Sequence, residues 1–81
     1  MKVTAQFYAQ LRDLIGEEKR EIQLIEDATV SDLLQKLYSE LPALRAHDKT
    51  VLIGVGMEFV DRNYKLKTGD EIAIMPPVQG G

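Results

Sequence analysis

The sequence predicts an α+β fold in which a mixed sheet of about five short strands packs on one long helix. Three features lead to this class: an alternating N-terminal segment, one apolar stripe at helical spacing, and short apolar runs between glycine and proline turns. A chain of 81 residues has room for one core. We therefore expect residues 1–81 to form a single domain, with residues 76–81 as its C-terminal tail.

The N-terminal residues alternate between apolar and polar, which is the period of a half-buried strand. A strand is predicted over residues 2–9, and its inward face carries Val3, Ala5, Phe7 and Ala9. A short helical turn over residues 10–15 follows and ends at Gly16, because glycine tolerates the left-handed angles of a helix end. Residues 20–24 alternate again and predict a second strand.

The clearest element is a helix that begins at Val30. Its apolar residues recur at helical spacing and form one stripe, which consists of Val30, Leu33, Leu34, Leu37, Tyr38 and Leu41. The hydroxyl of Thr29 is expected to cap the helix by accepting from the backbone N–H of Asp32. Pro42 is expected to end it, since proline lacks an N–H and restricts the residue before it.

The C-terminal half predicts three further strands. Residues 51–55 are almost continuously apolar, which is typical of a strand near the centre of a sheet. A tight turn at Gly56 leads into a short return strand at residues 58–60. The last strand is expected over residues 71–75 and is closed by Pro76-Pro77, because neither proline can donate to a strand ladder.

Composition argues against several kinds of function. A net charge of -3 with dispersed basic residues disfavours binding to nucleic acids and anionic membranes. The apolar runs are too short to span a bilayer, and no secretory leader is recognisable, so a cytoplasmic protein is expected. The absence of cysteine and the single histidine, His47, argue against a metal site built by this chain.

The ending PPVQGG is the candidate functional segment. Two prolines give a stiff exit from the sheet, and two terminal glycines carry no side chain that would block a narrow channel. Extended, these residues reach up to roughly 20 Å. The terminal carboxylate could enter another protein, become adenylated by ATP and then react with a sulfur nucleophile to give a thiocarboxylate. The alternative is a frayed terminus without function.

Three segments, FYAQLRDLIG, LKTGDEI and PPVQGG, resemble the MoaD family, the small subunit of molybdopterin synthase. The similarity covers essentially the whole chain and implies a ubiquitin-like β-grasp fold. It also implies that Gly81 carries a thiocarboxylate and that Gly80 is the flexible link beside it. The sulfur would pass to cyclic pyranopterin monophosphate and form the dithiolene of molybdopterin. The chain departs from the family at Gly56, where asparagine is common, and this affects only the turn.

The resemblance further implies the partners. A MoaE-like large subunit would receive the tail in a heterotetramer of two small and two large subunits. A MoeB-like enzyme would adenylate Gly81 with ATP and Mg²⁺, a separate sulfurtransferase would supply sulfur, and this chain itself would bind no cofactor or metal. The residues expected at the partner surface are Phe7, Tyr8, Arg12, Met75, Pro76, Pro77, Val78 and Gln79. The inward face of its strand favours Phe7 as a core residue, and Arg12 fits a local ion pair equally well.

Three other functions are compatible with the same tail. A ThiS-like carrier would donate sulfur to thiazole synthesis, although the Pro76-Pro77-Val78 run favours the molybdopterin interpretation. A ubiquitin-like modifier would join Gly81 to a lysine of a target protein. A binding module with an inert tail would keep its activity without Gly81.

Overall fold

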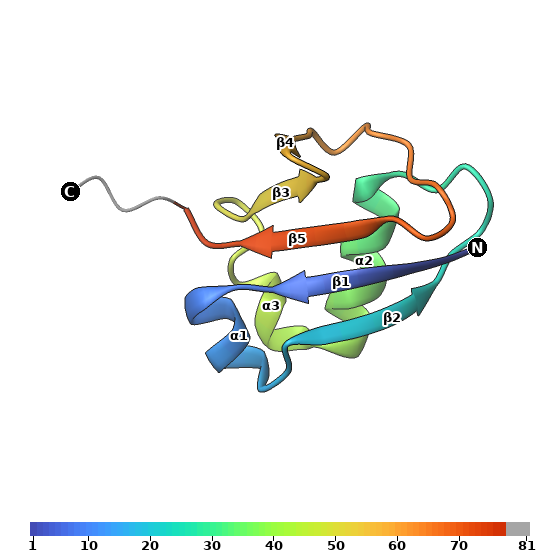
Figure 1. The fold of residues 1–81 in the computed structure, drawn as a ribbon. Coiled ribbons are helices and arrows are strands. Elements are labelled where there is room, and N and C mark those ends of the chain that lie inside the picture. Colours follow the sequence, from blue (N-terminus) through green and yellow to red (C-terminus); the bar gives the residue numbers. More distant parts are fainter. Residues whose placement is uncertain (78–81) are drawn as a thin grey trace.

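The computed structural model describes residues 1–77 (Figure 1). In chain order the elements are β1 (Lys2–Phe7), α1 (Ala9–Ile15), β2 (Lys19–Gln23), α2 (Val30–Glu40), α3 (Pro42–Arg45), β3 (Leu52–Val55), β4 (Glu58–Phe59) and β5 (Glu71–Met75). This is the α+β arrangement that the sequence predicts. Val78, Gln79, Gly80 and Gly81 lie outside the described residues, so their predicted roles stay predictions.

The strands form one mixed sheet in the order β2-β1-β5-β3-β4. β1 and β5 are parallel, with Phe7 beside Ile74, and the other neighbours are antiparallel. Because β1 and β5 run in the same direction, the start of α1 and the exit of the C-terminal segment lie at the same end of the sheet (Figure 1). The two strands that are most distant in the sequence therefore bring their ends together.

The core lies between one face of this sheet and the helices (Figure 1). The strands contribute Val3, Ala5, Phe7, Ile22, Ile53, Ile72 and Ile74, and α2 contributes Val30, Leu33, Leu34, Leu37 and Tyr38. Each of these side chains is almost completely removed from water, which is the main favourable contribution to folding. Among residues 1–77, no helix covers the other face of the sheet, which we call the open face.

The ends of the two longer helices are fixed as the sequence predicts. Thr29 and Asp32 form a reciprocal capping box at the start of α2: the Asp32 N–H donates to Thr29 Oγ1 at 3.3 Å, and the Thr29 N–H donates to Asp32 Oδ2 at 2.9 Å. At the end of α1, Gly16 takes a left-handed φ of 79° that costs other residues energy. Among residues 1–77, no helix is long and apolar enough to cross a membrane.

One local expectation was wrong, and two others were incomplete. Ala9 does not continue the first strand but begins α1 with a φ of 51°, and its side chain is exposed. Pro42 ends α2 but also starts α3, because proline suits the first turn of a helix. β3 has a neighbour on each side, yet the middle position belongs to β5, because the first and last strands pair in parallel.

A polar network joins the loops on the helix side. Asp48 accepts from the Tyr38 hydroxyl at 2.6 Å and from Arg62 Nη1 at 2.7 Å, and Arg62 Nη2 also donates to the Asp48 carbonyl. Hydrogen bonds from Tyr38 and Arg62 lower the pKa of Asp48, whereas burial and the Asp48 carboxylate raise the pKa of Tyr38. This network connects α2 to the two loops that flank β3 and β4.

Candidate functional site

The end of the sheet from which the tail departs combines β1, α1 and β5. Tyr8 follows β1 directly, and its N–H donates to the carbonyl of Ile74 at 3.1 Å. Met75 ends β5, and Pro76 and Pro77 lead away from the sheet. Tyr8 and Met75 are therefore held beside the point where the C-terminal segment begins.

The open face is unusually apolar from β5 to β4. Across it, Ala73 of β5 lies opposite Gly54 of β3, and Gly54 lies opposite Phe59 of β4. Phe59 is 69% exposed and Met57, in the preceding turn, is fully exposed, although either could be polar without any cost to the core. Contiguous apolar side chains left in water mark surfaces that bind other proteins.

These side chains surround a shallow depression, which we call the apolar hollow. Its lining includes Tyr8, Gly54, Met57, Phe59, Ala73 and Met75, and its volume is about 270 Å³. It adjoins the start of the tail, since Met75 belongs both to its wall and to the last residues before Pro76. A partner that binds the tail would also cover this hollow.

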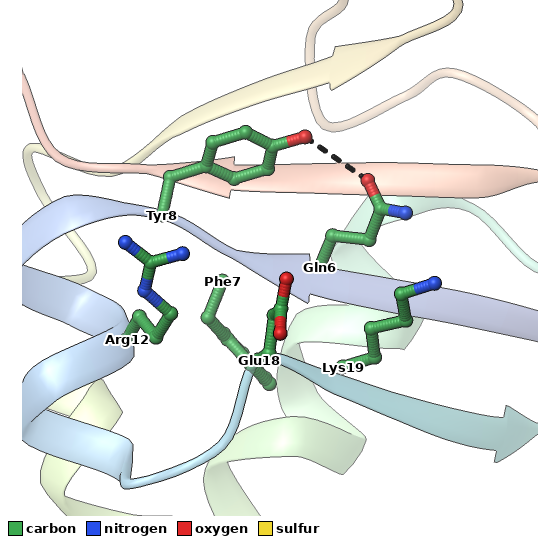
Figure 2. Close-up of a pocket in the computed structure, with 6 residues that line it drawn as sticks. All are labelled: Gln6, Phe7, Tyr8, Arg12, Glu18 and Lys19. Atoms are coloured by element: carbon green, nitrogen blue, oxygen red, sulfur yellow. Dashed lines mark hydrogen bonds between the residues drawn. The ribbon is translucent and has the colours of Figure 1, made fainter.

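Hydrogen bonds orient Tyr8 on the open face. Its hydroxyl donates to Gln6 Oε1 at 3.0 Å (Figure 2). Gln6 Nε2 in turn donates to Glu71 Oε1 at 2.9 Å. Both bonds are exposed, so each adds little to folding stability. They direct the tyrosine ring across the end of β5, toward the apolar hollow.

A second, polar hollow of about 130 Å³ lies on the other side of Tyr8. Figure 2 shows its lining, which consists of Gln6, Phe7, Tyr8, Arg12, Glu18 and Lys19. Within residues 1–77, Arg12 forms no ion pair, and its place in the last turn of α1 suits the negative end of the helix dipole. Its cationic group is thus available at the edge of the open face.

Most of the described residues predicted at a partner surface reach the surface at this end of the sheet. Tyr8, Arg12 and Pro77 are exposed, and Met75 and Pro76 are half-buried. The side chain of Phe7 lies in the core with 1% of its surface exposed, as the alternation of its strand indicates. The neighbouring Tyr8 supplies the aromatic ring on the open face.

Local sequence patterns do not reveal that Phe59 and Met57 are exposed or that Gly54 lines a hollow. The sequence predicts only that Phe59 belongs to a short return strand. The register that puts Phe59 opposite Gly54 depends on a turn at Gly56 with a φ of 64°. A register error of one residue would have turned Phe59 to the other face. The available signal was an aromatic residue at the second position after a two-residue turn.

The five-stranded mixed sheet over one long helix, with terminal strands paired at its centre, defines a ubiquitin-like β-grasp protein. The model of the ThiS family matches residues 5–81. The molybdopterin synthase sulfur carrier subunit of Chlamydomonas reinhardtii is 34% identical over 83 residues and covers 100% of both chains. That of Escherichia coli is 36% identical and covers 93% of this chain and 94% of its own. The chain belongs to the ThiS family and, within it, to the group of molybdopterin synthase sulfur carrier subunits.

Solved structures of similar fold agree with this family assignment. A putative molybdopterin converting factor subunit 1 from Pyrococcus furiosus has a TM-score of 0.86 at 30% identity, covering 96% of this chain and 99% of its own. SAMP1 of Haloferax volcanii, a small archaeal modifier protein, has a TM-score of 0.86 at 25% identity over 100% of both chains. Subunits 1 and 2 of the molybdopterin-converting factor of Helicobacter pylori form a complex, and a chain of it matches with a TM-score of 0.72 at 28% identity over 100% of both chains.

Proposed function

We propose that this chain is the sulfur carrier subunit of molybdopterin synthase and that Gly81 carries the sulfur as a thiocarboxylate. The observation that carries the proposal is that the ThiS family model matches residues 5–81 and that a relative bearing this name matches over 100% of the chain. The chain is then one component of a sulfur-transfer enzyme complex. It supplies the sulfur, and the large subunit supplies the residues that bind the pterin and catalyse the transfer.

The activation chemistry follows from the poor reactivity of a carboxylate. An oxygen of the Gly81 carboxylate attacks the α-phosphorus of ATP and releases pyrophosphate, which leaves an acyl adenylate. A sulfur nucleophile then displaces AMP and produces the thiocarboxylate. We assign ATP and Mg²⁺ to a MoeB-like activating enzyme and the sulfur supply to a separate sulfurtransferase. This chain's residues need only present the terminus.

Sulfur transfer then requires two carriers, each with a thiocarboxylate at Gly81, for every molecule of product. The dithiolene of molybdopterin contains two sulfur atoms, so cyclic pyranopterin monophosphate must react with two Gly81 thiocarboxylates. In each transfer the sulfur bonds to a carbon of the pterin, water then cleaves the bond between the sulfur and the Gly81 acyl carbon, and Gly81 returns to the carboxylate. The carrier must then return to the activating enzyme. A heterotetramer with two small and two large subunits is consistent with this stoichiometry, and the use of ATP is consistent with a cytoplasmic cycle.

We assign docking to the open face together with the tail. The apolar surface adjoins the exit of the tail, and a relative of the same fold is found in complex with its second subunit. Tyr8, Met75 and Pro76 would contact the large subunit, Arg12 would pair with a carboxylate at the edge, and Val78 and Gln79 would guide Gly80 and Gly81 into the partner. The open face is thus the recognition surface, and the tail is the reactive segment.

Intact-mass spectrometry tests this function. After incubation with the activating enzyme, ATP, Mg²⁺ and a sulfur source, we expect the mass shift that accompanies replacement of one oxygen by sulfur. Deletion of Gly81 should abolish both this shift and molybdopterin synthesis, because the thioacid is formed at that residue. The circular dichroism spectrum should stay unchanged, because the core lies within residues 1–77. A shortened chain that still supports synthesis would contradict the proposal.

A protein modifier is the second candidate, and the TM-score of 0.86 to SAMP1 favours it. In that case Gly81 would form an isopeptide bond with lysines of other proteins. Tryptic digests of host extracts would reveal the C-terminal remnant attached to lysine. The sulfur acceptor distinguishes a ThiS-like role in thiazole synthesis from the proposed function. In that role the carrier with a Gly81 thiocarboxylate would transfer sulfur in a thiazole synthase assay and not to the pterin.

A further inference from the structure

The floor of the apolar hollow is formed by the two smallest residues of the open face. Gly54 of β3 and Ala73 of β5 lie opposite each other, and the larger side chains of Tyr8, Phe59 and Met75 stand around them. Glu58 is the single charged residue in the lining among the residues that the structure describes. The result is a concave apolar surface and not a flat one.

The backbone does not require a glycine at position 54. Its φ lies outside the left-handed region, unlike those of the glycines at the turns. A glycine inside a strand weakens the strand, because it has no side chain to pack and loses more conformational entropy on folding. Gly54 therefore has a cost to folding that its own conformation does not explain.

The space above Gly54 offers an explanation. A Cβ atom at this position would lie 3.2 Å from Met75 Cε, 3.5 Å from the Glu58 carbonyl oxygen and 3.8 Å from Ala73 Cβ. The first contact is tight but falls on the flexible end of the methionine, so an alanine would displace that end without disturbing the backbone. Without this methyl group, the end of Met75 lies over Gly54 as part of the wall, and an added methyl group would push it into the hollow.

We propose that the apolar hollow receives one bulky apolar side chain of the large subunit, which takes up the tail, and that Gly54 determines which side chain fits. This inference rests on the proposed function. A volume of about 270 Å³ has room for such a group, since an enclosed cavity of about 150 Å³ holds benzene. Burying an apolar side chain in a fitting pocket is the usual source of binding energy at the centre of an interface.

The position of the hollow identifies this occupant rather than a second copy of the chain. Met75 forms part of the wall and is followed directly by Pro76-Pro77, so any protein that receives the terminus has to lie against this end of the sheet. The lining is almost free of charge, which matches an apolar side chain and not a basic or acidic one. The hollow and the tail then form one continuous recognition surface.

The test measures binding of the full-length chain to the purified large subunit by titration calorimetry. Gly54→Ala should weaken binding about tenfold and Ala73→Val by at least as much, because an overfilled pocket forces the partner side chain outward. Thermal unfolding should show that both variants keep the wild-type fold. Ser39→Thr, which adds one methyl group on the exposed surface of α2, should bind like the wild type.

A volume-conserving pair sharpens the test. Gly54→Ala combined with Ala73→Gly moves the methyl group across the floor without adding volume, so we expect the double variant to recover most of the lost affinity. Unchanged binding by both Gly54→Ala and Ala73→Val would overturn the inference. So would a wild-type homodimer, seen by analytical ultracentrifugation, that Gly54→Ala dissociates. Failure of the proposed function is distinguishable, because the wild type would then neither bind the large subunit nor acquire sulfur.

Discussion

The two faces of the sheet both carry apolar side chains, but for different reasons. On the face toward α2, residues such as Val3, Ile72 and Ile74 are almost completely buried, and their burial stabilises the fold. On the open face, Phe59 remains largely exposed to water and Tyr8 remains partly exposed. Their apolar surface adds nothing to the core, so its presence points to a partner.

This contrast separates the residues that maintain the fold from those that carry recognition. A substitution on the inner face should act on binding only through unfolding. A substitution on the open face should act on binding while the free energy of unfolding stays nearly constant. Measuring both quantities for each variant therefore tests whether the two faces are independent.

Phe7→Ala should have the largest effect. Phe7 is buried with 1% of its surface exposed, and removal of its ring leaves a cavity between the sheet and the helices. We expect the free energy of unfolding to fall by about 3 to 5 kcal/mol, which is a large part of the total for a domain of this size. Urea denaturation followed by circular dichroism measures it. A loss below about 1 kcal/mol would show that Phe7 is not part of a close-packed core.

Phe59→Ala should show the opposite pattern. The ring is 69% exposed, so the free energy of unfolding should change by no more than about 0.5 kcal/mol. Binding to the large subunit should weaken by about tenfold or more, as expected for an aromatic residue at the centre of an interface. Calorimetric titration provides the measurement, and Leu14→Ala, on the exposed side of α1, is a matched control. Equal affinities for Phe59→Ala and the wild type would remove Phe59 from the docking face.

The inner face was predictable from the sequence, whereas much of the open face was not. The stripe on α2, its Thr29 cap and the alternation around Phe7 follow from local periodicity, and the structure confirms them. The apolar hollow depends on cross-strand register and on the order of the strands, which bring Gly54, Ala73 and Phe59 together from different parts of the chain. Long-range pairing has no local signal. Ala9 was expected in the first strand because the apolar–polar alternation of residues 2–9 includes it. In the structure the chain already turns into α1 at this residue.

The polar network around Asp48 belongs to the helix side, and its effect should depend on pH. Hydrogen bonds from Tyr38 and Arg62 hold the pKa of Asp48 below its usual value. A carboxylate with a lowered folded-state pKa contributes stability that is present above its unfolded pKa, about 3.9, and is lost as the pH falls through the folded-state value. The free energy of unfolding should therefore decrease below about pH 4, and less steeply in Asp48→Asn. Parallel slopes for the two proteins would contradict this role.

Tyr8→Phe should have the smallest effect and is the finest test of the contrast. The variant keeps the ring on the open face but loses the donor to Gln6 Oε1 at 3.0 Å, and with it the link through Gln6 to Glu71. The free energy of unfolding should stay within about 0.5 kcal/mol, because the bond is exposed. Affinity for the large subunit should fall by only a few-fold, since the ring loses its fixed orientation but not its apolar area. Gln6→Leu, which removes the acceptor and keeps the tyrosine, should give a similar loss. If Tyr8→Phe binds as tightly as the wild type while Tyr8→Ala binds weakly, the ring alone contributes to docking and the hydrogen bonds do not.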